Sequence, residues 1–161
     1  VVCPDTSPRG LGIEGEDDSY DFGSGAGFYI SATTPLYKHN YQMFDYVTQE
    51  LPSIVEKHTP ADTHKKSIFG HSMGGLGALN CFLKTKDVYT SVSAFAPICN
   101  PMKCPWGKKG FTGYIGEDES KWKDWDPSVQ LHALGDNIPK MLISQGTDDQ
   151  FLHEQLLTES L

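Results

Sequence analysis

The chain has 161 residues, of which 38% are hydrophobic, and this is enough to bury the core of one globular domain. Its 21 acidic and 13 basic residues give a formal net charge of -8. A nucleic-acid or anionic-membrane partner is therefore not expected, because both are bound through basic patches, and a small-molecule partner is favoured. The sequence shows neither a membrane-length apolar run nor a signal peptide, so we expect a cytoplasmic protein that does not bind membranes.

The cysteines indicate free thiols rather than disulfides. Cys3, Cys81, Cys99 and Cys104 include no C-x-x-C pair, and a chain of this length does not need disulfides for stability. Cys99 and Cys104 have no paired histidine at ligand spacing, so we expect no metal site. Cys81 lies in an apolar segment and is predicted to be a small buried hydrophobic residue.

The first part of the chain predicts a strand end followed by a long loop. Residues 1–3 are apolar and run into the turn signal Pro4-Asp5. Residues 5–36 are rich in Gly and Ser without apolar periodicity, and loops of this length usually serve a function. The glycines of residues 23–27 do not form a dinucleotide-binding fingerprint, because Phe28 occupies the third glycine position and no strand precedes them.

Helices and strands alternate along the rest of the chain. A helix is expected from Asn40, its N-cap, with a kink at Pro52. Strands are expected at 67–69, 92–96 and 141–144, and further helices at 73–84, at 127–134 and from about 151, with an irregular Pro/Gly/Trp-rich stretch after residue 96. This alternation predicts an α/β fold with a mostly parallel sheet and helices on both faces.

The pattern G-x-S-x-G at residues 70–74 falls between a predicted strand and a predicted helix. There Ser72 would stand on a strained turn with its hydroxyl exposed, and the flanking glycines would avoid Cβ clashes with the neighbouring strand and helix. The amide N–H of Met73 would point at a developing oxyanion. Gly75 and Gly77 would let the helix pack close to the sheet. An ordinary Gly-rich turn is the alternative interpretation.

An acid should follow the nucleophile in chain order in this fold. Asp148 and Asp149 come directly after the strand at 141–144, near the strand end where open α/β sheets gather their sites. Asp149 is preferred because the usual pattern is G-x-x-D, with Asp148 as the alternative. Either residue could instead be a surface turn aspartate.

No histidine in the sequence suits the role of catalytic base. A base must be in reach of both the serine and the acid. One histidine adjoins Ser72 and should point away from its hydroxyl, four others precede the acid, and the last lies only four residues after Asp149. We interpret all six as structural or surface residues: His39, His58, His64, His71, His132 and His153.

Several long stretches resemble the esterase D, or S-formylglutathione hydrolase, family, and together they cover nearly the whole chain. They are far more restrictive than G-x-S-x-G alone. The matching residues are 4–10 (PDTSPRG), 21–23 (DFG), 27–29 (GFY), 46–48 (YVT), 50–52 (ELP), 67–75 (SIFGHSMGG), 91–101 (SVSAFAPICNP), 104–109 (CPWGKK), 145–146 (QG) and 148–151 (DDQF).

The resemblance implies the α/β-hydrolase fold and hydrolysis of S-formylglutathione, a glutathione thioester, and of simple esters without a cofactor. It makes Ser72 the nucleophile and Asp149 the acid. It also implies a histidine beyond Leu161 and a second oxyanion donor before Val1, so residues 1–161 would be the central part of a single domain that lacks both ends. We expect such a fragment to be inactive or nearly so.

Two further questions stay open at this stage. Glutathione would be recognised by residues 21–28 and the segment around Trp106, although Trp106 could equally be a core residue. The same nucleophile and acid would also suit a general carboxylesterase or an acyltransferase, and the chain could be a truncated, non-catalytic product. The oligomeric state is not determined, and a homodimer is one option.

Overall fold

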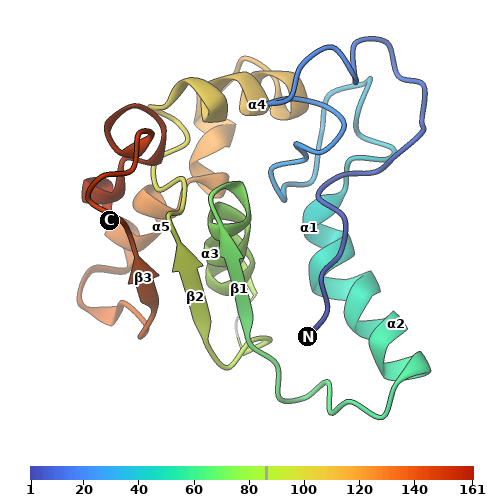
Figure 1. Cartoon of the computed structure of the whole chain (residues 1–161), viewed down its shortest axis with the longest axis vertical. Coiled ribbons are helices and arrows are strands. Elements are labelled where there is room, and N and C mark those ends of the chain that lie inside the picture. Colours follow the sequence, from blue (N-terminus) through green and yellow to red (C-terminus); the bar gives the residue numbers. More distant parts are fainter. Residues whose placement is uncertain (86) are drawn as a thin grey trace.

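The computed structural model describes residues 1–85 and 87–161, and its centre is a parallel sheet of three strands in the order β1-β2-β3 (Figure 1). The strands are β1 (Ile68–His71), β2 (Val92–Phe95) and β3 (Leu142–Ser144). Each lies within two residues of its predicted position. Because all of the pairings are parallel, the carboxyl ends of the strands share one edge of the sheet.

Helix α3 (Met73–Lys84) follows β1 directly and packs against β1 and β2 (Figure 1). Its bounds are those that the sequence predicted. Ala78 and Leu79 of this helix form a buried cluster with Val92 and Ala94 of β2. Alternation of side chains along a strand explains why these two β2 residues share the face that α3 covers.

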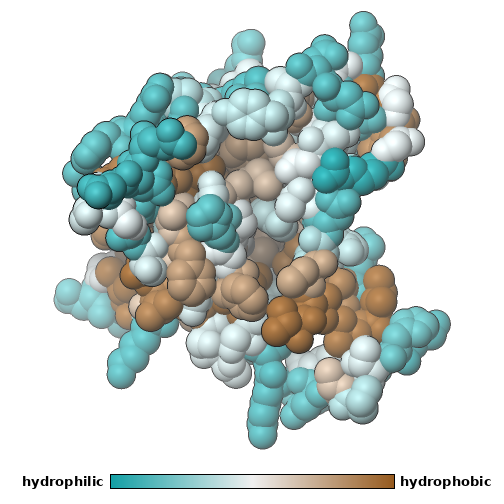
Figure 2. Space-filling model, viewed as in Figure 1, coloured by the Kyte–Doolittle hydropathy of each residue, from teal (hydrophilic) through white to brown (hydrophobic). Residues whose placement is uncertain are grey.

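The opposite face of the sheet carries exposed hydrophobic side chains. Phe69, Phe95 and Leu142 are 58%, 39% and 53% exposed, and hydrophobic residues gather over the strands on the face seen in Figure 2. Helices were predicted on both faces of the sheet. Within the described residues, the helix that packs against the strands is α3 on one face.

A long helical segment precedes the sheet and contains an irregular turn. It consists of α1 (Met43–Asp45), a π-helical turn (Tyr46–Glu50) and α2 (Leu51–His58). The prediction of a kink at Pro52 was wrong in form: the widened turn ends before Pro52, which lies in the first turn of α2, where a missing N–H is tolerated. Asn40 is not the cap, because the helix begins at Met43.

Helix α4 (Pro105–Ile115) lies in the stretch that the sequence indicated to be irregular. Its start is well formed, since Pro105 occupies the first turn and the Cys104 thiol accepts the N–H of Gly107 at 3.3 Å. Its three internal glycines lower helix propensity and hide it from sequence analysis. They serve packing instead: a Cβ on Gly113 would lie 2.2 Å from the Phe22 ring.

The remaining helical elements lie between α4 and the C-terminus. Helix α5 matches its predicted bounds, and Asp126 caps it by accepting the N–H groups of Ser128 and Val129. The helix expected near Phe151 is a π-helical turn. These elements are a 3-10 helix (Glu119–Trp125), α5 (Pro127–Leu134), a 3-10 turn (Gly135–Asn137), the π-helical turn (Leu152–Leu156) and a last 3-10 turn (Thr158–Ser160).

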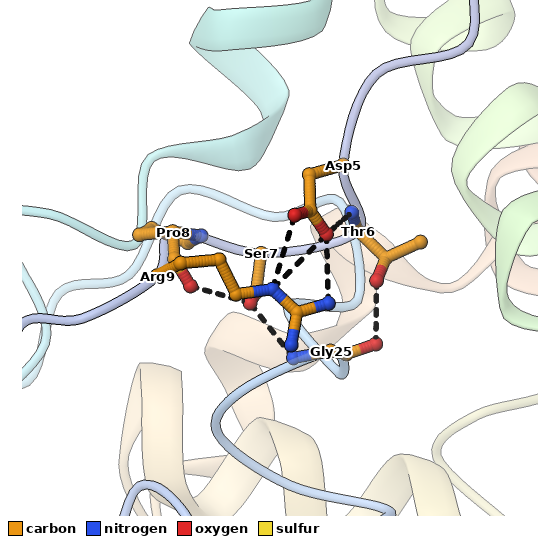
Figure 3. Close-up of polar contacts among 6 residues, drawn as sticks. All are labelled: Asp5, Thr6, Ser7, Pro8, Arg9 and Gly25. Atoms are coloured by element: carbon orange, nitrogen blue, oxygen red, sulfur yellow. Dashed lines mark hydrogen bonds and ion pairs between the residues drawn. The ribbon is translucent and has the colours of Figure 1, made fainter.

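The N-terminal residues and the long loop behave differently from each other. Residues 1–3 do not pair as a strand in the structure, contrary to the prediction. Residues 5–36 form a loop, as predicted, and its turns are tied together by hydrogen bonds (Figure 3). The Thr6 hydroxyl donates to the carbonyl of Gly25 at 2.8 Å, and the N–H of Gly25 donates to the Ser7 hydroxyl at 2.7 Å.

The main hydrophobic core lies between this loop and α4 rather than on the sheet. Phe28 and Ile30 from the loop and Phe111 from α4 are fully or almost fully buried. Tyr114 of α4 is the central contact, because its hydroxyl donates to the carbonyl of Ala26 at 2.9 Å and accepts the N–H of Gly23 at 2.8 Å. The core therefore fixes an irregular segment on a helix that spans the carboxyl side of the sheet (Figure 1).

All four cysteines are free thiols, as predicted. Cys81 is fully buried in α3, and this burial raises its pKa to about 12, so the residue acts as a small hydrophobic side chain. Within residues 1–85 and 87–161, none of the helices has the length and apolar character needed to span a bilayer.

Candidate active site

Ser72 occupies the turn between β1 and α3 with a backbone conformation that is rare outside glycine. Its φ is 56° and its ψ is -117°. Neighbouring backbone groups hold it there: the N–H of Ser72 donates to the carbonyl of Phe95 at 2.9 Å, and the Ser72 carbonyl accepts N–H groups from Leu76 at 3.1 Å and Ile98 at 3.3 Å. The strain is thus supported by β2, the turn that follows it, and α3.

The glycines around Ser72 have different roles. A Cβ on Gly70 would lie 2.0 Å from the carbonyl oxygen of Gly74, so this position requires glycine, as predicted. The same prediction was wrong for Gly74, since its Cβ would meet nothing within 4 Å. Gly75 approaches the turn after β2, where its Cβ would lie 2.8 Å from the Pro97 side chain.

Gly77 allows close packing, but against a different partner from the one predicted. Its Cβ would lie 2.4 Å from the ring of Tyr29, which belongs to the long loop and not to the sheet. The glycines of α3 therefore fit the helix between the turn after β2 and the loop. Periodicity along the helix does not reveal which neighbour a small residue will meet.

Met73 is the first residue of α3. The first amide groups of a helix have no partner within the helix, and the helix dipole makes this end favourable for negative charge. The N–H of Met73 is therefore available next to the Ser72 hydroxyl. This arrangement supports the prediction that Met73 supplies one oxyanion donor.

Asp149 lies beyond the end of β3, at the same sheet edge as Ser72, and its carboxylate is held by two hydrogen bonds. Oδ1 accepts the N–H of Phe151 at 2.9 Å, and Oδ2 accepts the amide of Gln145 at 3.3 Å. The Thr158 hydroxyl donates to the other side of the Gln145 amide at 3.1 Å and fixes its orientation. Asp148 is exposed, so the geometry favours Asp149 as the acid.

Gln145 and Thr158 were not identified by sequence analysis as part of this site. Gln145 contacts the acid and Thr158 contacts Gln145 after a chain reversal beyond β3, and neither residue type carries a chemical signal in isolation. The run Gln145-Gly146 was noticed only as part of the family resemblance.

A bridging group is needed between the serine and the acid. Because β2 separates β1 from β3, the two backbones lie two strand spacings apart, about 10 Å. Each of the six histidines is exposed, and among the described residues none of their imidazoles forms a hydrogen bond with Ser72 or Asp149. This agrees with the interpretation of these histidines as surface residues.

Trp106, the predicted substrate-binding residue, lies in the first turn of α4 and is half-buried. Its ring packs on Phe151, with centroids 4.9 Å apart, and its backbone N–H donates to the Gln155 side chain at 3.0 Å. Trp106 is thus both packed against the core and adjacent to the turn that carries Asp149. The two roles that the sequence left open are compatible with each other.

A groove of about 720 Å³ is lined by residues of β1, α2 and α3 and by Ser72. Val1, Val2, Leu51 and Val55 contribute apolar side chains to its walls.

Comparison with known proteins identifies the family and the fold. The family model described as "Putative esterase" matches residues 1–161. The chain belongs to this esterase family. Among the solved structures, an S-formylglutathione hydrolase from Agrobacterium tumefaciens superimposes with a TM-score of 0.91 at 41% identity over 98% of this chain and 58% of that chain. The fold is therefore that of the α/β-hydrolases, as predicted.

Curated relatives in the esterase family carry the same name. S-formylglutathione hydrolase of Mus musculus is 56% identical over 161 residues, which are 99% of this chain and 57% of that protein. S-formylglutathione hydrolase of Arabidopsis thaliana is 52% identical over 158 residues, or 98% of this chain and 55% of that protein. The chain thus spans little more than half the length of the curated relatives that it matches.

Proposed function

We propose that the chain is the central part of a serine thioesterase that hydrolyses S-formylglutathione to formate and glutathione. The observation that carries this proposal is the strained Ser72 between β1 and α3, with the restrained carboxylate of Asp149 at the same edge of the sheet. The identity of 56% with the mouse enzyme supports the choice of substrate.

In the proposed first step, the Ser72 hydroxyl attacks the formyl carbon and a histidine takes its proton. The carbonyl oxygen becomes an oxyanion, which the Met73 N–H stabilises at the positive end of α3. When the tetrahedral intermediate collapses, the C–S bond breaks. The histidine gives its proton to the sulfur, and glutathione leaves as the thiol. Ser72 then carries the formyl group as an ester.

In the second step, water attacks the formyl ester while the histidine takes a proton from it, and formate leaves as the Ser72 hydroxyl is restored. Asp149 fixes the tautomer of that histidine and stabilises its cationic form. The carboxylate can do so because Phe151 and Gln145 hold it in one orientation. The proposal takes this histidine to be a residue outside the 161, and it requires no cofactor.

The relatives and the free thiols also support a proposal about the cellular compartment and the pathway of this reaction. Three of the four free cysteines are buried, which suits a reducing compartment, so we place the enzyme in the cytoplasm. There it would complete glutathione-dependent removal of formaldehyde. A homodimer remains a prediction.

The test is a chimera in which the 161 residues replace the matching segment of the mouse enzyme. We expect it to hydrolyse S-formylglutathione with a higher kcat/KM than the acetyl and butyryl thioesters. The Ser72→Ala variant should lose about 10⁴-fold or more in kcat. Ser93→Ala, a substitution on β2, is the matched control and should retain activity.

Two outcomes would contradict the proposal. A clear preference for the butyryl thioester would make the protein a general carboxylesterase. Equal activity of the Ser72→Ala and Ser93→Ala chimeras would show that Ser72 is not the nucleophile. Circular dichroism of both variants separates a loss of catalysis from a loss of folding.

A further inference from the structure

Three aromatic side chains from separate parts of the chain form one surface beside the acid. Trp106 makes an edge-to-face contact with Tyr20, with centroids 6.3 Å apart, and a tilted contact with Phe151 at 4.9 Å. Tyr20 is 80% exposed and Phe151 is 38% exposed, so the rings present open surface to solvent. We call Tyr20, Trp106 and Phe151 the aromatic ledge.

The turn that carries Tyr20 is tied down on both sides. The Lys109 ammonium donates to the Ser19 hydroxyl at 2.9 Å and forms an ion pair with Asp21. Ser19 also pairs with Phe22 through a backbone bridge, so Tyr20 lies at the tip of a closed turn. Lys109 stands three residues after Trp106, on the same side of α4.

This restraint distinguishes Tyr20 from an ordinary surface aromatic residue. Single exposed hydrophobic side chains are normal on protein surfaces and need no special cause. Tyr20, however, has both of its chain neighbours bound to the same lysine and its ring against a tryptophan. A ring ordered in advance loses little entropy when a ligand binds, which is the property of a recognition element.

The ledge adjoins the acid end of the site. The N–H of Phe151 donates to the Asp149 carboxylate, so the ledge and the acid share one turn. In triad catalysis the histidine that is bonded to the acid delivers its proton to the leaving group. A leaving group as long as a peptide thiol would extend from this histidine toward the turn that carries Asp149 and Phe151.

We propose that the aromatic ledge binds the peptide-thiol part of the substrate, and that Tyr20 sets the preference for a peptide thiol over a small alcohol. This inference rests on the proposed function. A formyl group offers almost no surface, so selective binding has to come from the thiol side. Planar amide groups and sulfur atoms both make favourable contacts with aromatic rings.

Direct binding tests the ledge without requiring catalysis. The probe is S-methylglutathione, a thioether that the enzyme cannot cleave, titrated calorimetrically into the chimera. We expect Tyr20→Ala to weaken the Kd about 5- to 10-fold, the size of one aromatic contact. Tyr20→Phe should bind like the unsubstituted chimera, and Lys109→Ala should weaken binding by releasing the turn. The exposed neighbour Lys108 provides the control, and Lys108→Ala should change nothing.

Kinetics give the second measurement. Tyr20→Ala should raise KM for S-formylglutathione by the same 5- to 10-fold factor, about one aromatic contact, with kcat preserved. It should leave the hydrolysis of methyl formate, whose leaving group is too small to reach the ledge, unaltered. An unchanged Kd for S-methylglutathione in Tyr20→Ala, or an equal effect on methyl formate hydrolysis, contradicts the proposal that the aromatic ledge binds the peptide thiol.

The two proposals fail in different ways. A chimera without Ser72-dependent turnover contradicts the proposed function. The titration with S-methylglutathione then still shows whether the ledge binds the peptide thiol. A chimera that turns over S-formylglutathione with no dependence of binding on Tyr20 contradicts the ledge alone.

Discussion

The sheet and the long loop acquire their order in opposite ways. The strands are regular, yet one face of the sheet leaves large side chains such as Phe69 and Leu142 exposed. Residues 5–36 are irregular, yet they contribute Phe28 and Ile30 to the deepest part of the core. Regular secondary structure and burial are thus separate properties in this chain: a regular backbone ladder orders the sheet, and side-chain packing together with hydrogen bonds between its turns orders the loop.

The difference between the sheet edge and the loop has a consequence for function. The conformation of Ser72 depends on backbone groups of Phe95 and Ile98, whereas the position of Tyr20 depends on side-chain contacts with α4. Substitutions at the sheet edge should therefore change the rate of the chemical step. Substitutions between the loop and α4 should change stability and substrate binding instead.

The largest expected effect tests the sheet edge through the two neighbouring aspartates. In the chimera, Asp149→Asn should lower kcat for S-formylglutathione about 10³- to 10⁴-fold, because an amide orients the histidine in the wrong tautomer. The exposed Asp148 is the matched control, and Asp148→Asn should remain close to the unsubstituted chimera. If Asp148→Asn showed the larger loss, the assignment of the acid would have to be reversed.

An intermediate effect tests how the Ser72 turn is built. Gly70→Ala would place a Cβ 2.0 Å from the Gly74 carbonyl oxygen, and neither backbone can move without breaking the turn. We expect a loss of about 3 kcal/mol in the free energy of unfolding, measured with urea. Gly74→Ala meets no atom within 4 Å and should stay within about 1 kcal/mol of the unsubstituted chimera. Similar losses for the two variants would show that this close contact does not determine the turn.

The smallest effect tests the packing of the loop on α4. A Cβ on Gly113 would lie 2.2 Å from the Phe22 ring, and that ring is stacked on Tyr114 with centroids 4.6 Å apart, so it has little room to move. We expect Gly113→Ala to destabilise the protein by about 1–2 kcal/mol.

Gly110 provides the control for this packing test. Its Cβ would lie 3.0 Å from the Phe28 ring, and the gain in helix propensity should offset the small strain, so Gly110→Ala should be nearly neutral. Both variants should keep kcat for S-formylglutathione within about twofold, because neither alters the Ser72 turn or the acid; twofold in kcat is only about 0.4 kcal/mol in the barrier. A large loss of kcat in Gly113→Ala with unchanged stability would contradict the idea that the contact between the loop and α4 affects stability and not the chemical step.

Local patterns were sufficient where a segment has a clear period and clear ends. The bounds of α3 and α5 were predicted from the local sequence pattern, and the structure confirms both. Helix α4 was missed because its internal glycines reduce the helical signal and are needed only for contact with other segments. The π-helical turn before Pro52 was also missed, since the sequence marks where a helix is disturbed but not the geometry that results.

The sequence by itself predicted the position of the nucleophile. G-x-S-x-G between a strand and a helix is a local pattern, and the requirement at Gly70 follows from the backbone of the same turn. The choice of Asp149 over Asp148 also came from a short pattern, and the hydrogen bond from Phe151 supports it.

Only the tertiary structure decided which distant residues meet at the site. The contact of Thr158 with Gln145, the restraint of Tyr20 by Lys109 and the packing of Gly77 on Tyr29 all join segments that have no common period. The last two contacts depend on how the loop closes over α3 and α4. A side chain's own neighbours in the sequence do not record that closure, because it results from the packing of the whole core.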